Sequence, residues 1–147
     1  MKTRLVKILP IAAVLSGLLV TSQSASAITG LADNKESALE VLPGYHFQWK
    51  LQTASDEDWF LWQNNTEDKH DLSASLTSPS GKNFDLEAHH VTSQKTVVVQ
   101  AEDHGSGKTD SLRVNAVQPG EKVYLRLKTH DGDYSTTSNY DFTYSIQ

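Results

Sequence analysis

The chain has 147 residues, with 13 basic and 18 acidic side chains and no cysteine. Without cysteine no disulfide can form, so the fold must be held by its hydrophobic core, helped at most by a metal ion. The acidic balance repels phosphate groups, which argues against nucleic acid and against membranes as partners.

The N-terminal segment predicts an export signal. Lys2, Arg4 and Lys7 precede an apolar run over residues 8–20, and a small polar stretch then ends in Ala-Ser-Ala at residues 25–27. This order is typical of a cleavable signal peptide, and the apolar run is shorter than the roughly 20 residues of a membrane-spanning helix. We expect a signal peptide over 1–27 and a secreted domain over 28–147, periplasmic if the host has an outer membrane. Cleavage would leave 10 basic against 18 acidic residues, a net charge of −8.

The rest of the chain predicts an all-β fold. Apolar and polar residues alternate in short runs with turn signals between them, which is typical of half-buried antiparallel strands. About eight such runs in one domain-sized stretch predict a single antiparallel β-sandwich or barrel. A short helical turn near residues 36–41 is compatible with the pattern. The expected strands lie at residues 45–52, 59–62, 72–76, 84–89, 97–99, 112–116, 123–128 and 140–146.

The alternation also predicts which side chains face the core. In the run at 112–116, Leu112, Val114 and Ala116 share the apolar face. The side chains expected to point inward elsewhere are Phe60, Trp62, Leu125, Leu127, Phe142 and Tyr144.

Several short motifs occur in a recognisable order. They are Asp33-Asn34 before Ser37-Ala38, Asp56-Glu57-Asp58-Trp59-Phe60, Leu-Thr-Ser-Pro-Ser-Gly at 76–81, Phe-Asp-Leu at 84–86, Pro-Gly at 119–120 before Tyr-Leu-Arg-Leu at 124–127, and Asn-Tyr-Asp-Phe at 139–142.

Over nearly all of residues 31–147, this order resembles the bacterial pre-peptidase C-terminal domain family, which includes the collagen-binding domains of clostridial collagenases. The resemblance implies a jelly-roll-like β-sandwich, usually appended to secreted proteases. Here we expect the domain to stand alone.

The resemblance also implies a calcium site. In the family, calcium lies between the acidic lead-in and the aspartate before the aromatic strand, and the matching positions here are Asp33, Asn34, Asp56 and Asp58. Calcium takes roughly six to eight oxygen ligands, which clustered carboxylates and carbonyls supply. The alternative is an ordinary solvated turn at residues 56–58, in which Asp58 holds a loop backbone.

Aromatic residues offer a second kind of candidate site. Trp59 alternates with Phe60, so one of the two must face away from the core, and Tyr124 and Tyr134 could join an exposed Trp59. Such a platform would suit a glycan or a protein chain. The alternative is that Trp59 belongs to the core, where large aromatic side chains are more usual.

No catalytic signature is present. The chain has no G-x-S-x-G, no HExxH and no thiol. We therefore expect a secreted non-enzymatic binding module for an extracellular protein or polysaccharide, with Ca²⁺ as its candidate cofactor. The alternatives are a secreted inhibitor or folding partner of an exported protease and, after it, a hydrolase whose site leaves no motif.

Overall fold

The computed structural model describes residue 30 and residues 32–147. The expected signal peptide over 1–27 and the expected mature N-terminus at Ile28 lie outside the described residues. Within them there is a short 3-10 helix, η1 (Lys35–Ser37), and no helix long and apolar enough to cross a membrane. The strands are β1 (Leu39–Glu40), β2 (Phe47–Trp49), β3 (Glu57–Gln63), β4 (His70–Thr77), β5 (Phe84–Val91), β6 (Thr96–Gln100), β7 (Thr109–Val117), β8 (Lys122–Thr129) and β9 (Tyr140–Ile146).

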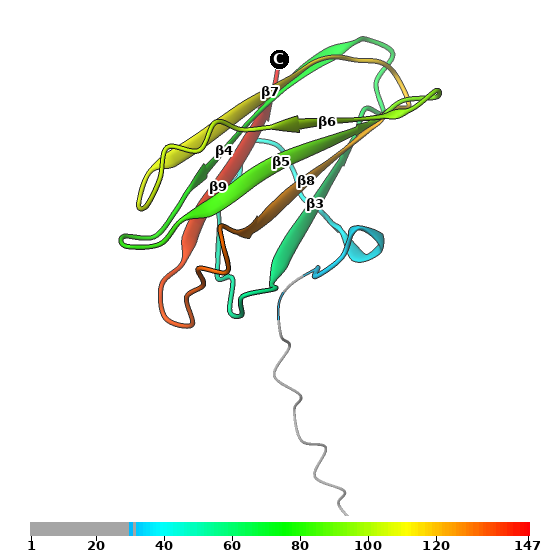
Figure 1. Ribbon diagram of the computed structural model, residues 1–147. Coiled ribbons are helices and arrows are strands. Elements are labelled where there is room, and N and C mark those ends of the chain that lie inside the picture. The colour runs from blue at the N-terminus through cyan, green and yellow to red at the C-terminus, as the bar shows by residue number, and fades with distance from the viewer. Residues whose placement is uncertain (1–29, 31) are drawn as a thin grey trace, which may run out of the picture.

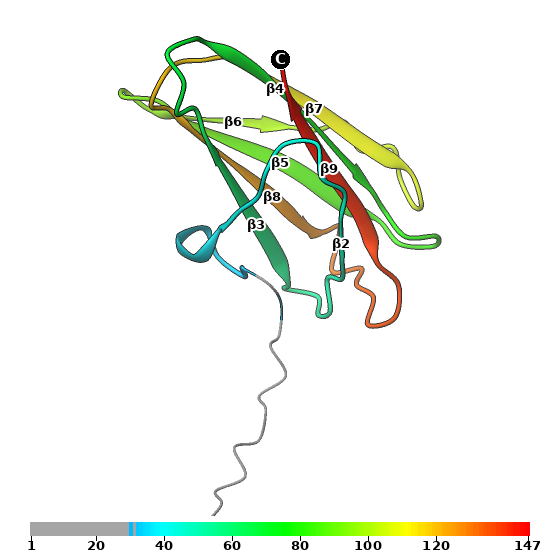
Figure 2. The same ribbon diagram turned by 180° about the vertical axis from the view of Figure 1, so that it is seen from behind.

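Two sheets pack face to face, which confirms the all-β sandwich. One sheet has the order β1-β3-β8-β5-β6 and lies in front in Figure 1; the other has the order β2-β9-β4-β7 and comes forward in Figure 2. All eight expected strands are present, and β1 is an additional one. The pairing is antiparallel except between β1 and β3, where Leu39 lies opposite Phe60 in a parallel pair. The chain crosses to the other sheet at β2 before it returns as β3, so β1 and β3 run in the same direction.

The core lies between the sheets and contains the residues of β3, β8 and β9 that the alternation predicted to point inward. Trp62 is only partly buried but packs against the core. Phe60 and Phe142, one from each sheet, stack with their ring centroids 4.7 Å apart. The other predicted core residues, Leu125, Leu127 and Tyr144, are buried.

The expected phase was wrong at the end of β7. Ala116 is exposed and has a φ of +55°, and Val117 is buried in its place. From Val114 to Val117 the chain of β7 advances by three positions, whereas the paired stretch of β4, from Leu72 to His70, advances by two, which is a β-bulge. Asp71 holds the bulge, because its Oδ1 accepts a hydrogen bond from the Ala116 N–H at 2.7 Å.

Candidate functional site

A cluster of three carboxylates lies where the N-terminal segment meets the start of β3. Asp33 precedes η1, Asp56 ends the loop before β3, and Asp58 is the second residue of β3. One oxygen from each carboxylate lies within 4.8 Å of the other two. The structure therefore brings together three of the four residues predicted as calcium ligands.

Backbone and side-chain hydrogen bonds position the cluster. The Trp59 N–H donates to the Ala32 carbonyl at 3.1 Å, which places the N-terminal segment beside β3. The Asp56 carboxylate accepts from the Gln52 N–H at 2.5 Å. Asp58 shares the inward face of β3 with Phe60, so it is fully buried, and it accepts a hydrogen bond from Tyr140 Oη at 2.6 Å.

Gly30 lies next to the cluster and has no side chain that could fill the space beside the carboxylates. Its φ is +83°, and a Cβ at this position would lie 1.8 Å from Asp33 Oδ1 and 2.8 Å from Asp56 Oδ1. A side chain at residue 30 would therefore occupy the space next to the carboxylates. Glycine also avoids the strain that other residues meet at a positive φ.

Asn34 lies beside the cluster and caps η1. Its side-chain oxygen accepts a hydrogen bond from the Ser37 N–H at 3.0 Å. Asparagine is a favoured N-cap because this bond satisfies a free N–H group of the first turn. The place of Asn34 in a calcium site stays a prediction.

The charges of the cluster are unfavourable without a cation. Burial raises the pKa of Asp56, and the nearby charge of Asp33 raises it further. Burial raises the pKa of Tyr140 far above its usual range, as does the charge of Asp58, so the Tyr140 hydroxyl stays protonated and donates. An oxygen-only donor set with like charges in close contact suits a hard divalent cation such as Ca²⁺. With one oxygen from each, the three carboxylates supply fewer than the roughly six to eight oxygen ligands that calcium takes. Backbone carbonyls and water would complete the coordination shell.

Trp59 lies on the outer face of the five-stranded sheet, beneath polar side chains. Its indole N–H donates to Glu57 at 2.9 Å, the Arg126 guanidinium lies 5.4 Å from its ring centroid, and the His89 ring packs edge-on at 5.0 Å. Only 7 % of Trp59 is exposed. Trp59 is thus buried, as one interpretation of the sequence expected, but outside the core between the sheets.

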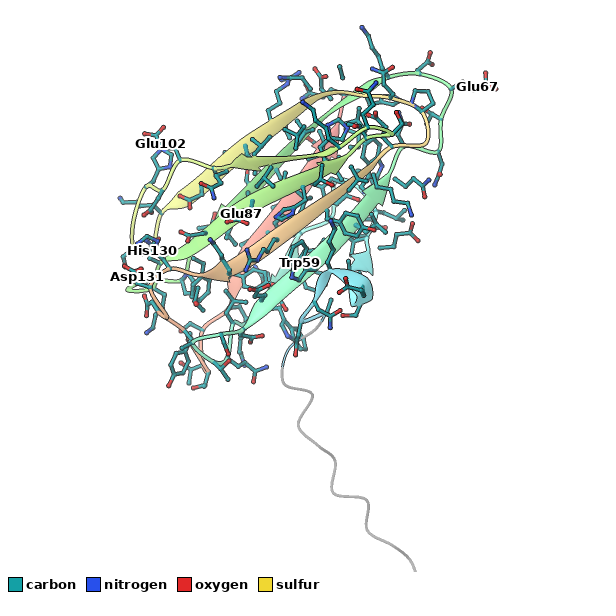
Figure 3. The ribbon with its side chains drawn as sticks, turned by 45° about the vertical axis from the view of Figure 1, so that its right-hand side comes forward. Trp59, Glu67, Glu87, Glu102, His130 and Asp131 are labelled. Carbon is teal, nitrogen blue, oxygen red and sulfur yellow. The ribbon has the colours of Figure 1, made fainter. Side chains whose placement is uncertain are left out.

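Ion pairs hold in place the polar side chains that cover Trp59. Arg126 bonds to both Glu57 and Glu87, and Lys128 lies 2.7 Å from Glu87. Burial opposes the ionisation of Glu87, but hydrogen bonds from Lys128 and His89 and the charges of Lys128 and Arg126 lower its pKa to about 2. Figure 3 shows Trp59 and Glu87 over the same sheet.

The other two predicted platform residues are placed differently. Tyr124 shares the outer face with Trp59, two residue pairs along β3 and β8, and the Lys35 ammonium lies 4.6 Å from the Tyr124 ring centroid. Tyr134 is exposed, but it belongs to the loop between β8 and β9. Trp59 and Tyr124 are therefore neighbours on one sheet, whereas Tyr134 comes from a loop at its end.

An apolar groove that the sequence did not reveal lies beside β2. Its volume is about 280 Å³. Leu42 and Tyr45 are 68 % and 67 % exposed. Tyr144 forms part of the floor, and its hydroxyl donates to the Val41 carbonyl, which ties the segment before β2 to β9. The signal that could have revealed it is the pair of apolar residues flanking the exposed Pro43-Gly44 turn. The lining residues are Val41, Leu42, Tyr45, His46, Phe47, Phe142 and Tyr144.

A second group of metal-ligating side chains lies at the end of the five-stranded sheet. His130 Nδ1 is 2.9 Å from Asp85 and 3.6 Å from Asp103, and its Nε2 is 3.6 Å from Asp131. The hydrogen bond and the charge of Asp85 raise the pKa of His130. His130 links three segments of the chain, and it is the cation of this group when it is protonated, at the corner where Figure 3 labels His130 and Asp131.

Known structures share this fold. No protein-family model matches the sequence, and no curated protein matches it. The periplasmic lysozyme inhibitor PliG of Aeromonas hydrophila, an inhibitor of g-type lysozyme, is a more distant match: it is 12 % identical with a TM-score of 0.46, over 75 % of this chain and 96 % of its own. The pre-peptidase C-terminal domain of a collagenase from Bacillus anthracis is similar over 74 % of this chain and 94 % of its own, with 17 % identity and a TM-score of 0.55. The resemblance inferred from the motifs is thus confirmed as a likeness of fold: this chain folds as a pre-peptidase C-terminal-like β-sandwich.

Proposed function

We propose that this protein is an exported, non-catalytic module that binds an extended apolar segment of another protein in the groove beside β2. The observation that carries the proposal is the groove itself, where Leu42 and Tyr45 hold large apolar surfaces in solvent above a floor built from β9. Contiguous exposed apolar surface of this kind marks interaction sites, because leaving it in water is unfavourable.

A protein segment fits the groove better than a polysaccharide does. Sugar rings stack on open aromatic faces flanked by polar groups, whereas this groove is lined mainly by aliphatic and aromatic carbon. Trp59, the largest aromatic side chain of the predicted platform, is covered by Arg126 and His89. The groove also follows β2, an edge strand of its sheet, and an extended chain can add to such an edge through backbone hydrogen bonds.

Calcium binding at the cluster of Asp33, Asp56 and Asp58 supports this function through stability. An ion there would join the N-terminal segment to the start of β3, next to the segment that leads to the groove. A ligand that binds only the folded state stabilises that state by RT ln(1 + [L]/Kd), where [L] is the free ligand concentration. This amounts to about 2.7 kcal/mol when [L] is a hundred times Kd. Its proposed role is structural, because the groove side chains do not belong to the cluster.

The binding proposal is tested by comparing what three proteins retain from spent medium of the producing culture. The proteins are the wild type, a groove variant carrying Leu42→Asp and Tyr45→Ser, and a control, Tyr134→Ala, which removes an exposed tyrosine elsewhere. We expect the wild type and the control to retain the same proteins, identified by mass spectrometry, and the groove variant to lose them. Equal retention by all three would overturn the groove as the site. Retention of soluble polysaccharide, lost only with Tyr134→Ala, would favour the aromatic platform instead.

A further inference from the structure

One end of the five-stranded sheet brings together an imidazole and two carboxylates that the proposed function does not use. Asp85 lies between two buried residues of β5, so its side chain belongs to the outer face, and it pairs with Lys128 of β8. The His130 N–H donates to the Asn83 carbonyl at 3.1 Å, which continues this pairing and places His130 on the same face. Asp103 comes from the loop after β6. One ligand atom from each of Asp85, Asp103 and His130 lies within 4.8 Å of the other two.

The distances within this cluster suit the coordination of zinc. His130 Nδ1 lies 2.9 Å from Asp85 Oδ1 and 3.6 Å from Asp103 Oδ2. Tetrahedral ligands at roughly 2.0–2.1 Å from zinc are about 3.3 Å from one another. The two distances in the protein lie on either side of this value. An ion between the three side chains would therefore require only small movements of them.

Neighbouring groups orient Asp103 toward His130. Asp103 Oδ1 accepts hydrogen bonds from the Gly105 N–H at 2.7 Å and from Asn83 Nδ2 at 3.1 Å. The backbone N–H of Asn83 donates in turn to Asp133 at 2.9 Å. Metal ligands in proteins are commonly held in this way, by hydrogen bonds from groups that do not contact the ion.

The amide oxygen of Asn83 is an independent indication of a ligand at this cluster. Asn83 Oδ1 is enclosed by protein and accepts no hydrogen bond from the residues that the structure describes. Enclosed oxygens without a donor are uncommon, because they lose their hydration without compensation. This oxygen shares its carbon with the nitrogen that contacts Asp103, so it adjoins the cluster. A water molecule bound to a metal ion is the kind of donor that would satisfy it.

The charges of the cluster also favour a cation. The Lys128 ammonium lies 2.7 Å from Glu87 but 3.9 Å from Asp85. Within the described part of the chain, the ion pair of Asp103 is with His130. When His130 is neutral, the carboxylates of Asp85 and Asp103 therefore face each other without a close cation between them. Like charges at this distance favour binding of a positive ion.

We propose that Asp85, Asp103 and His130 bind one zinc ion, with water at a fourth position. A nitrogen ligand with two carboxylates suits zinc and the neighbouring first-row metals, whereas calcium and magnesium prefer oxygen ligands alone. The ligand atom of His130 is Nδ1, because Nε2 faces Asp131, whose side chain is 94 % exposed. A cavity of about 190 Å³ beside the three residues leaves room for the water. The ion links the start of β5, the loop after β6 and the loop after β8.

Equilibrium dialysis and calorimetric titration with zinc chloride test the proposal. The protein, recovered as exported into culture medium, is first freed of metal with a chelator. It is then measured at about pH 8, which favours the neutral imidazole that binds metal. About 1 mM calcium is present to occupy any calcium site at Asp33, Asp56 and Asp58. We expect one zinc ion per chain, and we expect Co²⁺ in its place to give the visible absorption of a tetrahedral ion.

Substitutions assign the zinc ion to this cluster. His130→Gln and Asp103→Asn should each weaken zinc binding at least about tenfold, because loss even of a group that only orients a ligand has an effect of this size. His104→Gln is the matched control and should keep the wild-type affinity, since the His104 ring lies 3.4 Å from Asp110 instead. Circular dichroism and thermal melts verify that each variant is folded.

Several results would overturn the zinc site. One is a wild type that binds no zinc under these conditions. Others are zinc binding that survives both His130→Gln and Asp103→Asn, or that is lost in His104→Gln. Displacement of the zinc by an equal concentration of calcium would also contradict the proposal, because a site with an imidazole ligand should prefer zinc.

Discussion

Asp33 and Asp58 belong to the same carboxylate cluster but differ in exposure. This difference decides which of the two residues can be substituted to test calcium binding without destabilising the fold. Asp58 is buried and accepts the Tyr140 hydroxyl, so Asp58→Ala would destabilise the fold with or without the ion. Asp33 is exposed. We expect the wild-type melting temperature to rise with calcium and fall with chelator, and Asp33→Ala to abolish most of this response while still folding.

A control for this prediction removes a carboxylate outside the cluster. Glu36→Ala lies one turn further along, at an exposed position of η1, and should keep the full calcium response. Identical wild-type melts in calcium and in chelator, with no heat in a calorimetric titration, would leave Asp56 and Asp58 as structural turn residues.

His130 is expected to make stability depend on pH. The hydrogen bond and charge of Asp85 raise its folded-state pKa above the ordinary 6.5. Its contribution is therefore complete below about pH 6.5 and is lost as the pH rises through the folded-state pKa. We expect the free energy of unfolding, measured by chemical denaturation, to fall over this range, and the fall to be shallower in His130→Gln. The effect should be small, because the side chain is 38 % exposed. An unchanged slope in the variant would mean that the link to Asp85 does not persist in solution.

At the scale of the element, β8 organises the larger sheet. It pairs with β3 on one side and β5 on the other, and Leu125 and Leu127 point from it into the core. Leu125→Ala should cost about 2–5 kcal/mol of unfolding free energy, because the cavity it leaves cannot close fully between two sheets. Lys122→Ala, at the partly exposed start of the same strand, should change stability by less than about 0.5 kcal/mol. Chemical denaturation measures both, and an unchanged midpoint for Leu125→Ala would contradict the core assignment.

At the scale of the whole molecule, export defines which chain folds. If the segment over 1–27 is a signal peptide, signal peptidase removes it after Ala27 and the mature protein begins at Ile28. N-terminal sequencing and intact mass of protein from the culture medium should show Ile28 first. Recovery of Met1, or of the protein in the membrane fraction, would contradict this prediction.

The sequence by itself determined the sandwich and its core. Side chains on a strand alternate between two faces, so Phe60, Leu125 and Phe142 could be assigned to the interior from their neighbours alone. The same rule did not anticipate Ala116, because a bulge changes the phase and depends on Asp71 from the neighbouring strand. β1 was missed because two residues form no periodic pattern.

Only the tertiary structure decided how the candidate sites are built. The family resemblance named Asp33, Asp56 and Asp58, but their approach to one another depends on the contact between Ala32 and Trp59 and on a glycine at residue 30. Periodicity places Trp59 on one face of a strand and cannot tell whether Arg126, from another strand, covers it. The groove beside β2 joins residues about 100 positions apart in the chain, such as Leu42 and Tyr144. Local patterns describe neighbours in sequence, whereas burial and charge at a site are determined by neighbours in space.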